Sequence, residues 1–473
     1  MTTPRRPSRP RRRGPPARRT GPRRPPVENP ARRAALDALA AVRERDAYAN
    51  LVLPGLLRER GISGRDAALS TELCYGTSRA RGLLDAVLQT CVDRPLSEVD
   101  GELLDALRLG SYQLLRTRVP PHAAVAATVD LVRAARGSGA AGFVNAVLRR
   151  VGRHDENAWI EAVAPARDDD PVGHLAMAHS HPRWIAQVFA DALGGDHDEL
   201  AAALAADTRP LVHLVARPGQ ISAAELAAAT GGQAAPYSPY GVHLAEGGDP
   251  GELAPVRDHL AHVQDEGSQL VALALADAPL DGPDGRWLDL CAGPGGKAAL
   301  LGALAAIRGA TLDAVEPAEH RARLVRQACA GLPVTVYVAD GRDSGLPERA
   351  FDRVLVDVPC TGLGALRRRP EARWRRRPDD VAGLVRLQRE LLLAAWRLVR
   401  AGGVVAYVTC SPHTDETVGV VQDVLRRTGA EQLDATVGFP GVPLLGEGPQ
   451  VQLWPHRHGT DAMFCALFRR PGG

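Results

Sequence analysis

Lysine is almost absent from this chain of 473 residues. Of its 58 basic residues only Lys297 is a lysine, and aromatic residues make up 4% of the sequence. Charged residues interrupt every apolar run before it is long enough to cross a bilayer. The basic N-terminus leads into no apolar stretch, so we expect no signal peptide. These absences argue against a membrane protein and predict no membrane partner.

Zinc-ligand and disulfide patterns are missing as well. The chain has seven cysteines, and none of them forms a CxxC pair. They are Cys74, Cys91, Cys291, Cys329, Cys360, Cys410 and Cys465. An odd and scattered set argues against a disulfide framework and against a zinc site. We therefore expect no bound metal, and we expect the protein to act in a reducing cytoplasm.

Acidic residues are missing from the N-terminal segment. Residues 1–26 contain ten arginines and no acid, whereas the rest of the chain has 48 basic and 55 acidic residues. An Arg/Pro segment of low complexity has no apolar groups to bury, so we expect residues 1–26 to be disordered. Such an arm either attracts RNA phosphates without sequence preference or serves as a solubilising tail. We favour the first interpretation.

The length predicts two or three domains. In residues 27–155 apolar residues recur at helical spacing without strand-like alternation, which predicts an all-α domain. Residues 156–265 begin with a polar connector and then mix helical patterns with short strand candidates such as 211–216. We expect a small α+β subdomain there.

Residues 266–473 alternate between apolar strand candidates and amphipathic helices. The expected strands are 287–290, 311–315, 334–338, 354–356, 404–408 and 462–468. The helices between them include 318–330 and 381–400. This alternation predicts a doubly wound, mostly parallel sheet, a Rossmann-like α/β domain. Ligands of such sheets bind at the carboxyl ends of the strands.

A glycine-rich turn follows the first of these strands. The run Trp-Leu-Asp-Leu-Cys-Ala-Gly-Pro-Gly-Gly-Lys ends at Lys297, and its glycines let the backbone turn sharply and approach a ligand. Taken alone the turn would also suit a dinucleotide. Acids close the next three strands, Glu316, Asp340 and Asp357. Acids in register at three strand ends suit a ligand rich in hydroxyls and amines, although each one could instead cap a helix.

Two cysteines lie just beyond strand ends on the same edge of the sheet. Cys360 is the cysteine of Asp-Val-Pro-Cys-Thr-Gly, which follows one strand candidate. Cys410 is the cysteine of Thr-Cys-Ser-Pro, which follows the next. A single cysteine there would be best explained as a small buried residue. Two of them beside a cofactor loop favour covalent catalysis. A thiolate that adds to C6 of cytosine makes C5 able to attack a methyl donor, and Asp357 is placed to act near N3 or N4 of the base.

From residue 263 to its end the chain resembles the RNA cytosine-C5 methyltransferase family. The resemblance rests on Cys-Ala-Gly-Pro-Gly-Gly-Lys, Asp-Val-Pro-Cys-Thr-Gly and Thr-Cys-Ser-Pro. It implies an S-adenosylmethionine cofactor, Cys410 as the nucleophile and Cys360 as the residue that assists release. The implied cofactor contacts are Cys291, Ala292, Gly293, Pro294, Gly295, Gly296, Lys297, Glu316, Asp340 and Asp357. DNA cytosine-C5 methyltransferases use the Pro-Cys cysteine and lack the Thr-Cys partner, so the pair favours RNA.

The helical domain carries a second resemblance. The segments 143–150 and 121–125 resemble the NusB-like RNA-binding domain, which is fused to the methyltransferase in Fmu/RsmB-type 16S ribosomal RNA enzymes. Together the two resemblances span roughly residues 30 to 470. The chain departs from the pattern at Ala462-Met463, where the family usually has Gly and an aromatic residue, and in its Arg/Pro tail.

An arginine-rich stretch follows the Pro-Cys motif. Residues 366–377 contain seven arginines and Trp374. We expect phosphate contacts or base stacking from these residues rather than a merely solvated loop. The candidates are Arg367, Arg368, Arg369, Arg373, Trp374 and Arg375. We assign no catalytic role to His181, Arg183 and Trp184, and we do not favour a Cys410–His413 dyad.

The leading hypothesis is methylation of C5 of a cytosine in 16S ribosomal RNA. The alternatives are a tRNA or 23S enzyme of the same chemistry, and a non-catalytic NusB-like RNA-binding or antitermination factor. An amino-methyltransferase is disfavoured, because Asp-Val-Pro-Cys stands where that chemistry uses an Asn/Asp-Pro-Pro-Tyr type motif. A monomer is the favoured oligomeric state.

Overall fold

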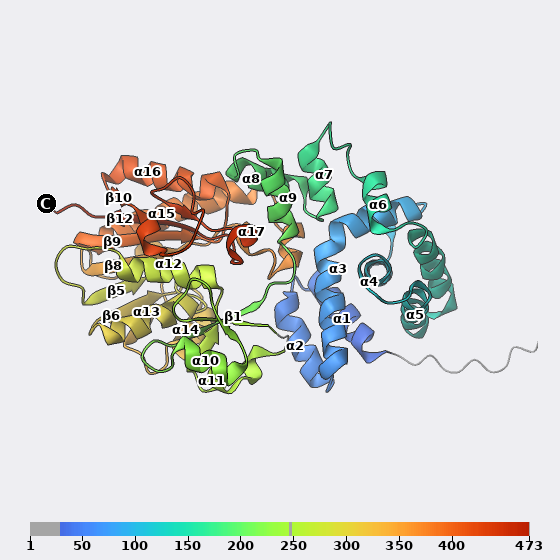
Figure 1. Cartoon of the computed structure of the whole chain (residues 1–473), viewed down its shortest axis with the longest axis horizontal. Coiled ribbons are helices and arrows are strands. Elements are labelled where there is room, and N and C mark those ends of the chain that lie inside the picture. The colour runs from blue at the N-terminus through green and yellow to red at the C-terminus, as the bar shows by residue number, and fades with distance from the viewer. Residues whose placement is uncertain (1–28, 246–247, 473) are drawn as a thin grey trace, which may run out of the picture.

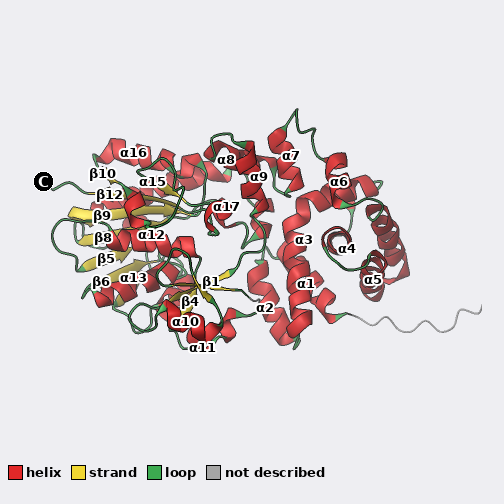
Figure 2. Cartoon of the chain, viewed as in Figure 1, coloured by secondary structure: helices red, strands yellow, loops and turns green. Residues whose placement is uncertain are grey.

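The computed structural model describes residues 29–245 and 248–472, so the Arg/Pro segment lies outside the described residues. The chain forms a helical part at one end, an α/β part at the other and a connecting part between them (Figure 1). Helices and strands are segregated in the same way in Figure 2, where strands occur only in the connecting and α/β parts. Within the described residues, no helix is both long and apolar enough to cross a membrane.

The N-terminal part is all-α, as predicted. Its helices are α1 (Pro30–Glu44), α2 (Ala49–Glu59), α3 (Gly64–Cys91), α4 (Gly101–Arg116), α5 (Pro121–Val151) and α6 (Glu156–Val163). Helix α1 begins where the Asn29 side chain accepts a hydrogen bond from the Arg32 N–H, with Pro30 in the first turn. The apolar stripes of α3, α4 and α5 meet in one core that contains Leu83, Leu107 and Val144.

The connecting part has three helices followed by a small sheet. The helices are α7 (Pro171–Ala178), α8 (Arg183–Ala192) and α9 (His197–Ala205). The sheet is antiparallel in the order β2-β3-β1-β4 and confirms the expected α+β subdomain. Its elements are β1 (Val212–Ala216), α10 (Ala223–Thr230), β2 (Gln233–Ala234), β3 (Gly241–Leu244), α11 (Ala254–Arg257) and β4 (Ala261–Val263).

The C-terminal sheet has the order β10-β12-β9-β8-β5-β6-β7, with β11 paired to β12. The strands are β5 (Arg286–Asp289), β6 (Thr311–Val315), β7 (Val334–Tyr337), β8 (Phe351–Asp357), β9 (Val399–Thr409), β10 (Glu431–Leu433), β11 (Val451–Gln452) and β12 (Phe464–Arg469). All six predicted strands are present. The five from β9 to β7 are parallel, whereas β12 runs antiparallel to β9.

Helices cover both faces of this sheet (Figure 1). The helices are α12 (Glu266–Asp277), α13 (Gly296–Ile307), α14 (Glu319–Ala328), α15 (Asp380–Leu398), α16 (Val418–Thr428) and α17 (Pro455–His458). Helices α12, α13 and α14 share one core with the sheet, and α15 and α16 share the other. Strands buried on both faces read as continuous apolar runs, which is why the sequence revealed them.

Candidate active site

The glycine-rich turn joins the end of β5 to the start of α13. Gly295 has φ +114°, and a Cβ there would lie 2.9 Å from Ala328 Cβ. A Cβ on Gly293 would lie 2.0 Å from Glu316 Oε2. Gly295 therefore requires glycine, because its positive φ would strain any other residue, whereas a side chain at Gly293 would have to displace the Glu316 carboxylate. Arg321 closes the turn by donating from Nη2 to the Gly293 carbonyl at 2.6 Å.

The two acids that follow the next strands differ in their surroundings. Glu316 is buried just after β6 and accepts a hydrogen bond from the Ala318 N–H at 3.0 Å. Asp340 follows β7 with 46% of its side chain exposed, and it pairs with Arg342 at 2.7 Å. Asp340 also accepts from the Arg342 N–H and so caps a short helical turn. This agrees with the alternative interpretation that a strand-end acid could be a helix cap. Both carboxylates nevertheless lie at the carboxyl edge of the sheet, where a ligand binds.

Lys297 lies in the first turn of α13 and reaches the Pro-Cys motif. Its Nζ is 2.8 Å from Asp357 Oδ2, and only 11% of its side chain is exposed. Burial lowers the pKa of Lys297, but Asp357 outweighs it, so the pKa is raised and the ammonium stays charged. The single lysine of the chain thus joins the cofactor loop to the fourth strand end.

Asp289 is a site residue that the sequence analysis missed. It is buried at the end of β5, and its carboxylate accepts from the Cys291 N–H at 3.3 Å. Burial, and then the charge of Asp357, raise its pKa to about 7. The predicted strand ran through to residue 290, which made Asp289 look like an interior strand residue. The structure ends β5 at Asp289 and adds a fourth acid to the strand ends.

The two predicted cysteines come together. Cys360 Sγ lies 3.4 Å from Cys410 Sγ, although fifty residues separate them in the sequence. Gly364 holds the two loops in place, because its N–H donates to the Cys410 carbonyl at 2.9 Å and its carbonyl accepts from the Ala462 N–H at 2.9 Å. A Cβ on Gly364 would lie 2.1 Å from the Ala462 carbonyl oxygen, so only glycine permits this approach.

Cys410 rests as a thiol. Its hydrogen bond with Cys360, its burial and the charge of Asp357 raise the pKa well above the ordinary value, while Lys297 lowers it. A nucleophilic role therefore requires the proton to leave when the site fills. His413 is not arranged to take it, because its Nδ1 accepts from the Asp415 N–H within the following turn.

Glu416 is the second residue that the sequence analysis missed. It is buried, and its Oε1 accepts from the Thr361 N–H at 2.8 Å and from Gln388 Nε2 at 2.9 Å. Its Oε2 accepts from Ser411 Oγ at 2.6 Å. One carboxylate thus fixes the residue after Cys360 and the residue after Cys410. The sequence feature that could have indicated Glu416 is its position, six residues after Cys410 in the same loop.

The stretch 366–377, here called the arginine segment, lies differently from its prediction. Arg367 is buried and pairs with Asp461 at 2.6 Å and Asp265 at 2.9 Å, and Arg368 pairs with the same two acids. Arg373 is fully buried and pairs with Asp207 at 2.6 Å. These guanidinium groups bind protein carboxylates in place of RNA phosphates. The sequence could not show this, because the acids lie at least 90 residues away along the chain.

Other residues of the arginine segment contact the helical part. Arg375 Nη2 donates to the carbonyls of Val42 at 3.0 Å and Ala47 at 2.6 Å. Trp374 packs against Gly82 of α3, where a Cβ would lie 2.5 Å from its ring. Of the predicted RNA-binding residues only Arg369 is exposed, with its guanidinium 5.2 Å from the centre of the Tyr48 ring.

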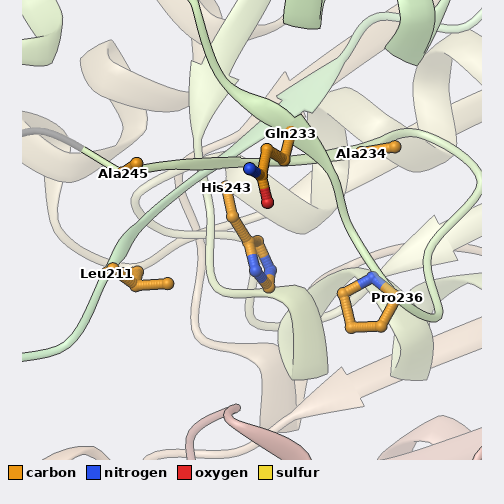
Figure 3. Close-up of a pocket in the computed structure, with 6 residues that line it drawn as sticks. All are labelled: Leu211, Gln233, Ala234, Pro236, His243 and Ala245. Atoms are coloured by element: carbon orange, nitrogen blue, oxygen red, sulfur yellow. The ribbon is translucent and has the colours of Figure 1, made fainter.

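A pocket of about 300 Å³ lies on the small sheet, and neither Cys360 nor Cys410 lines it. Its lining residues are Leu211, Gln233, Ala234, Pro236, His243 and Ala245 (Figure 3). The His243 ring stacks on His213 at 3.8 Å between centroids. In the described residues no group of three or more His, Cys, Asp or Glu side chains is placed to hold a metal ion.

Comparisons with known proteins agree with this architecture. Residues 275–469 match the family model described as 16S rRNA methyltransferase RsmB/F, and residues 29–153 match the NusB family. A Mycobacterium tuberculosis (strain ATCC 25618 / H37Rv) protein named as a methyltransferase, Rv1407, is 62% identical over 95% of this chain and 98% of its own. Ribosomal RNA small subunit methyltransferase B of Pseudomonas putida is 35% identical over 85% of this chain and 91% of its own.

Solved structures share the fold. The crystal structure of PH0851 covers 94% of this chain and 99% of its own with a TM-score of 0.78 at 20% identity. NSun6 from Pyrococcus horikoshii covers 62% of this chain and 99% of its own with a TM-score of 0.52 at 18% identity.

Fold and site together define an S-adenosylmethionine-dependent methyltransferase with paired strand-end cysteines. The chain belongs to the RsmB/F family of RNA cytosine-C5 methyltransferases, fused to a NusB-family domain. The resemblance inferred from the motifs is thereby confirmed at the level of family, fold, cofactor and enzyme class.

Proposed function

We propose that this enzyme methylates C5 of a cytosine in 16S ribosomal RNA, with Cys410 as nucleophile and Cys360 as the residue that assists release. The observation that carries the assignment is the 3.4 Å separation of the two Sγ atoms, beside the Lys297–Asp357 pair. Two thiols this close can reach the same face of one base, which a mechanism with addition and elimination on neighbouring carbons requires.

The residues around the glycine turn fit the cofactor. Gly293 and Gly295 let the turn pack closely against Glu316 and α14, and Glu316 and Asp340 offer carboxylates to hydroxyl and amino groups. We infer that residues 291–297 contact the cofactor together with these acids. When bound, S-adenosylmethionine supplies an electrophilic methyl group. Asp289 precedes the turn and accepts from the Cys291 N–H, and Lys297 at its end pairs with Asp357, so both add charge next to the turn.

The proposed reaction proceeds through a covalent bond to the enzyme. Cys410 passes its proton to Asp357 and its sulfur bonds to C6, which moves electron density to C5. Asp357 lies at the N3 and N4 edge of the base and hands that proton to N3, which neutralises the electron-rich ring. After C5 has taken the methyl group, the C5 proton passes to solvent, the S–C6 bond breaks, and the sulfur recovers its electron pair and, through Asp357, the proton from N3. Cys360 lies within reach of this step and assists it.

The substrate assignment rests on relatives rather than on the site. The Pseudomonas putida relative is named for the small-subunit ribosomal RNA, and a NusB-family domain precedes the catalytic part in this chain. Arg369, the exposed one among the residues predicted to bind RNA, is the RNA contact that we propose. A tRNA or 23S target of the same chemistry is the competing assignment.

One experiment separates these substrates. The enzyme is incubated with labelled cofactor and total RNA from a strain that lacks it, and the labelled cytosine is mapped by bisulfite sequencing. We expect one modified cytosine in 16S RNA. Label confined to tRNA or 23S RNA would replace the 16S assignment, and label on no cytosine at C5 would overturn the proposed reaction.

A further inference from the structure

We propose that the arginine segment is a positioning element that links the seating of the helical part to the position of Cys360. The inference rests on the proposed roles of Cys410 and Cys360. It assigns to the helical part a task in catalysis besides any contact that it makes with RNA. The segment begins six residues after Cys360 and ends just before α15, so it is part of the same loop.

One end of this link is anchored in the helical part. Trp374 lies against Gly82 of α3, and Glu371 Oε1 accepts from the Ala49 N–H at the start of α2, at 3.1 Å. The guanidinium groups of Arg369 and Arg375 lie 5.2 and 5.1 Å from the centre of the Tyr48 ring. These contacts engage the α1–α2 turn and one face of α3, so the segment follows the helical part as a unit.

Arg373 fixes the centre of the segment to three parts of the chain at once. Its Nη1 donates to the carbonyl of Arg79 in α3 at 3.0 Å and to that of Ser180 at 3.3 Å. Its Nη2 donates to Asp207 Oδ2 at 2.6 Å, and the same oxygen lies 2.9 Å from His181 Nε2. A fully buried guanidinium with this many carbonyl and carboxylate partners holds its backbone rigidly.

The other end of the link is bonded to the residue after Cys360. Arg376 Nε donates to the Thr361 carbonyl at 3.0 Å. On the preceding side, Gln388 of α15 donates to the Pro359 carbonyl at 3.0 Å. Cys360 is therefore held between two residues that the arginine segment and the following helix position. A shift of the segment reaches Cys360 through the Arg376 hydrogen bond and the five residues between them, whereas Glu416 holds the Thr361 N–H on the other side.

Cys410 is held more firmly than Cys360 against such a shift, although the Gly364 N–H also donates to its carbonyl at 2.9 Å. It directly follows β9, an eleven-residue strand paired on both sides with β8 and β12. Cys360 lies three residues beyond the end of β8, in loop structure. Loosening the segment should therefore displace Cys360 more than Cys410. Addition to the base would continue while release of the methylated base slows, and the covalent RNA–enzyme adduct would accumulate.

Gly82→Ala tests this link from the helical part without removing any group. The new methyl group would lie 2.5 Å from the Trp374 ring and must push it aside, whereas alanine suits the α3 helix. Gly142→Ala in α5 is the matched control, because nothing lies within 4 Å of its Cβ. Arg376→Ala removes the hydrogen bond to Thr361 alone, and Arg376→Lys keeps a donor there.

The readout is the fraction of full-length enzyme trapped on substrate RNA in a denaturing gel, together with multiple-turnover methylation. We expect Gly82→Ala and Arg376→Ala to raise the adduct at least fivefold and to slow turnover by a similar factor. Gly142→Ala should match the wild type, and Arg376→Lys should recover most of the turnover. A merely structural role would lower adduct and turnover together.

Cys360→Ala is the positive control, since it should trap the adduct by itself. If Cys360→Ala traps adduct and both Gly82→Ala and Arg376→Ala release like the wild type, the positioning role is wrong while the proposed function stands. If Cys360→Ala traps none, the assigned cysteine roles fail and the positioning role falls with them. Should Gly82→Ala unfold, Arg376→Ala decides, because it leaves the contacts between the parts intact.

Discussion

Lys297 Nζ lies 2.8 Å from Asp357 Oδ2, and this pair joins the glycine turn after β5 to the Pro-Cys loop after β8. In a chain whose other basic residues are arginines, the site keeps a compact ammonium. An ammonium makes a point contact, whereas a guanidinium is a wide planar fork that needs room for five donors. The small, mostly buried space beside Asp357 explains the lysine.

The Lys297→Arg variant should therefore lose methyl-transfer activity, although the substitution keeps the positive charge. We expect a loss of methyl transfer of roughly a hundredfold or more, because the fork displaces Asp357 or the turn. Steady-state methylation of RNA measures it. Arg286→Lys is the matched control, since that residue pairs with Asp313 at a site with 41% of the arginine side chain exposed. Equal activity of Lys297→Arg and the wild type would refute the role of the ammonium.

Alanine variants of Arg369 and Arg367 should distinguish an arginine that contacts RNA from one that pairs with carboxylates inside the protein. Arg369 is exposed, so Arg369→Ala should weaken RNA binding and lower the slope of log K against log salt by about 1. Arg367 is buried between Asp265 and Asp461, so Arg367→Ala should leave the slope unchanged and destabilise the fold by about 3 kcal/mol. Salt titrations of RNA binding and urea unfolding measure the two effects. A lower slope of log K against log salt for Arg367→Ala would instead support the phosphate contact that the sequence predicts for Arg367.

Asp289 should make stability depend on pH. Its folded pKa, about 7, is raised above the ordinary value of 3.8, so the folded state holds the proton more tightly than the unfolded state. Its contribution to stability is complete below pH 3.8 and is lost as the pH rises towards 7. Three pKa units correspond to about 4 kcal/mol.

Asp289→Asn removes this loss while keeping an acceptor for the Cys291 N–H. The variant should therefore gain stability relative to the wild type at pH 8 and little at pH 4.5, as measured by urea unfolding at both values. Asp93→Asn, with 92% of its side chain exposed, should show no such difference. An equal effect of Asp289→Asn at the two pH values would contradict the raised pKa.

The sequence revealed those parts of the site that lie on one continuous segment. The glycine turn and the two cysteines follow apolar strands, and local pattern was enough to place them at one sheet edge. Asp289 escaped because the end of β5 was placed one residue too late. The short strands β10 and β11 escaped because two or three residues carry no period.

Partners far away in sequence account for the remaining differences. In the sequence, Arg367 and Arg373 look like phosphate ligands. In the fold, Arg367 pairs with Asp461 and Asp265, and Arg373 pairs with Asp207. Density of charge along the chain cannot show whether a guanidinium faces solvent or a buried carboxylate. Glu416 joins the two cysteine loops for the same reason, through contacts that no single motif contains.

The most direct test of the account is the denaturing-gel adduct of Cys360→Ala and Cys410→Ala with substrate RNA. The 3.4 Å separation allows either sulfur to reach the base, so only the chemistry distinguishes them. We predict that Cys360→Ala accumulates a protein–RNA adduct that survives denaturation, and that Cys410→Ala forms none and transfers no methyl group. An adduct from Cys410→Ala, or methyl transfer by it, would contradict the assignment of Cys410 as the nucleophile.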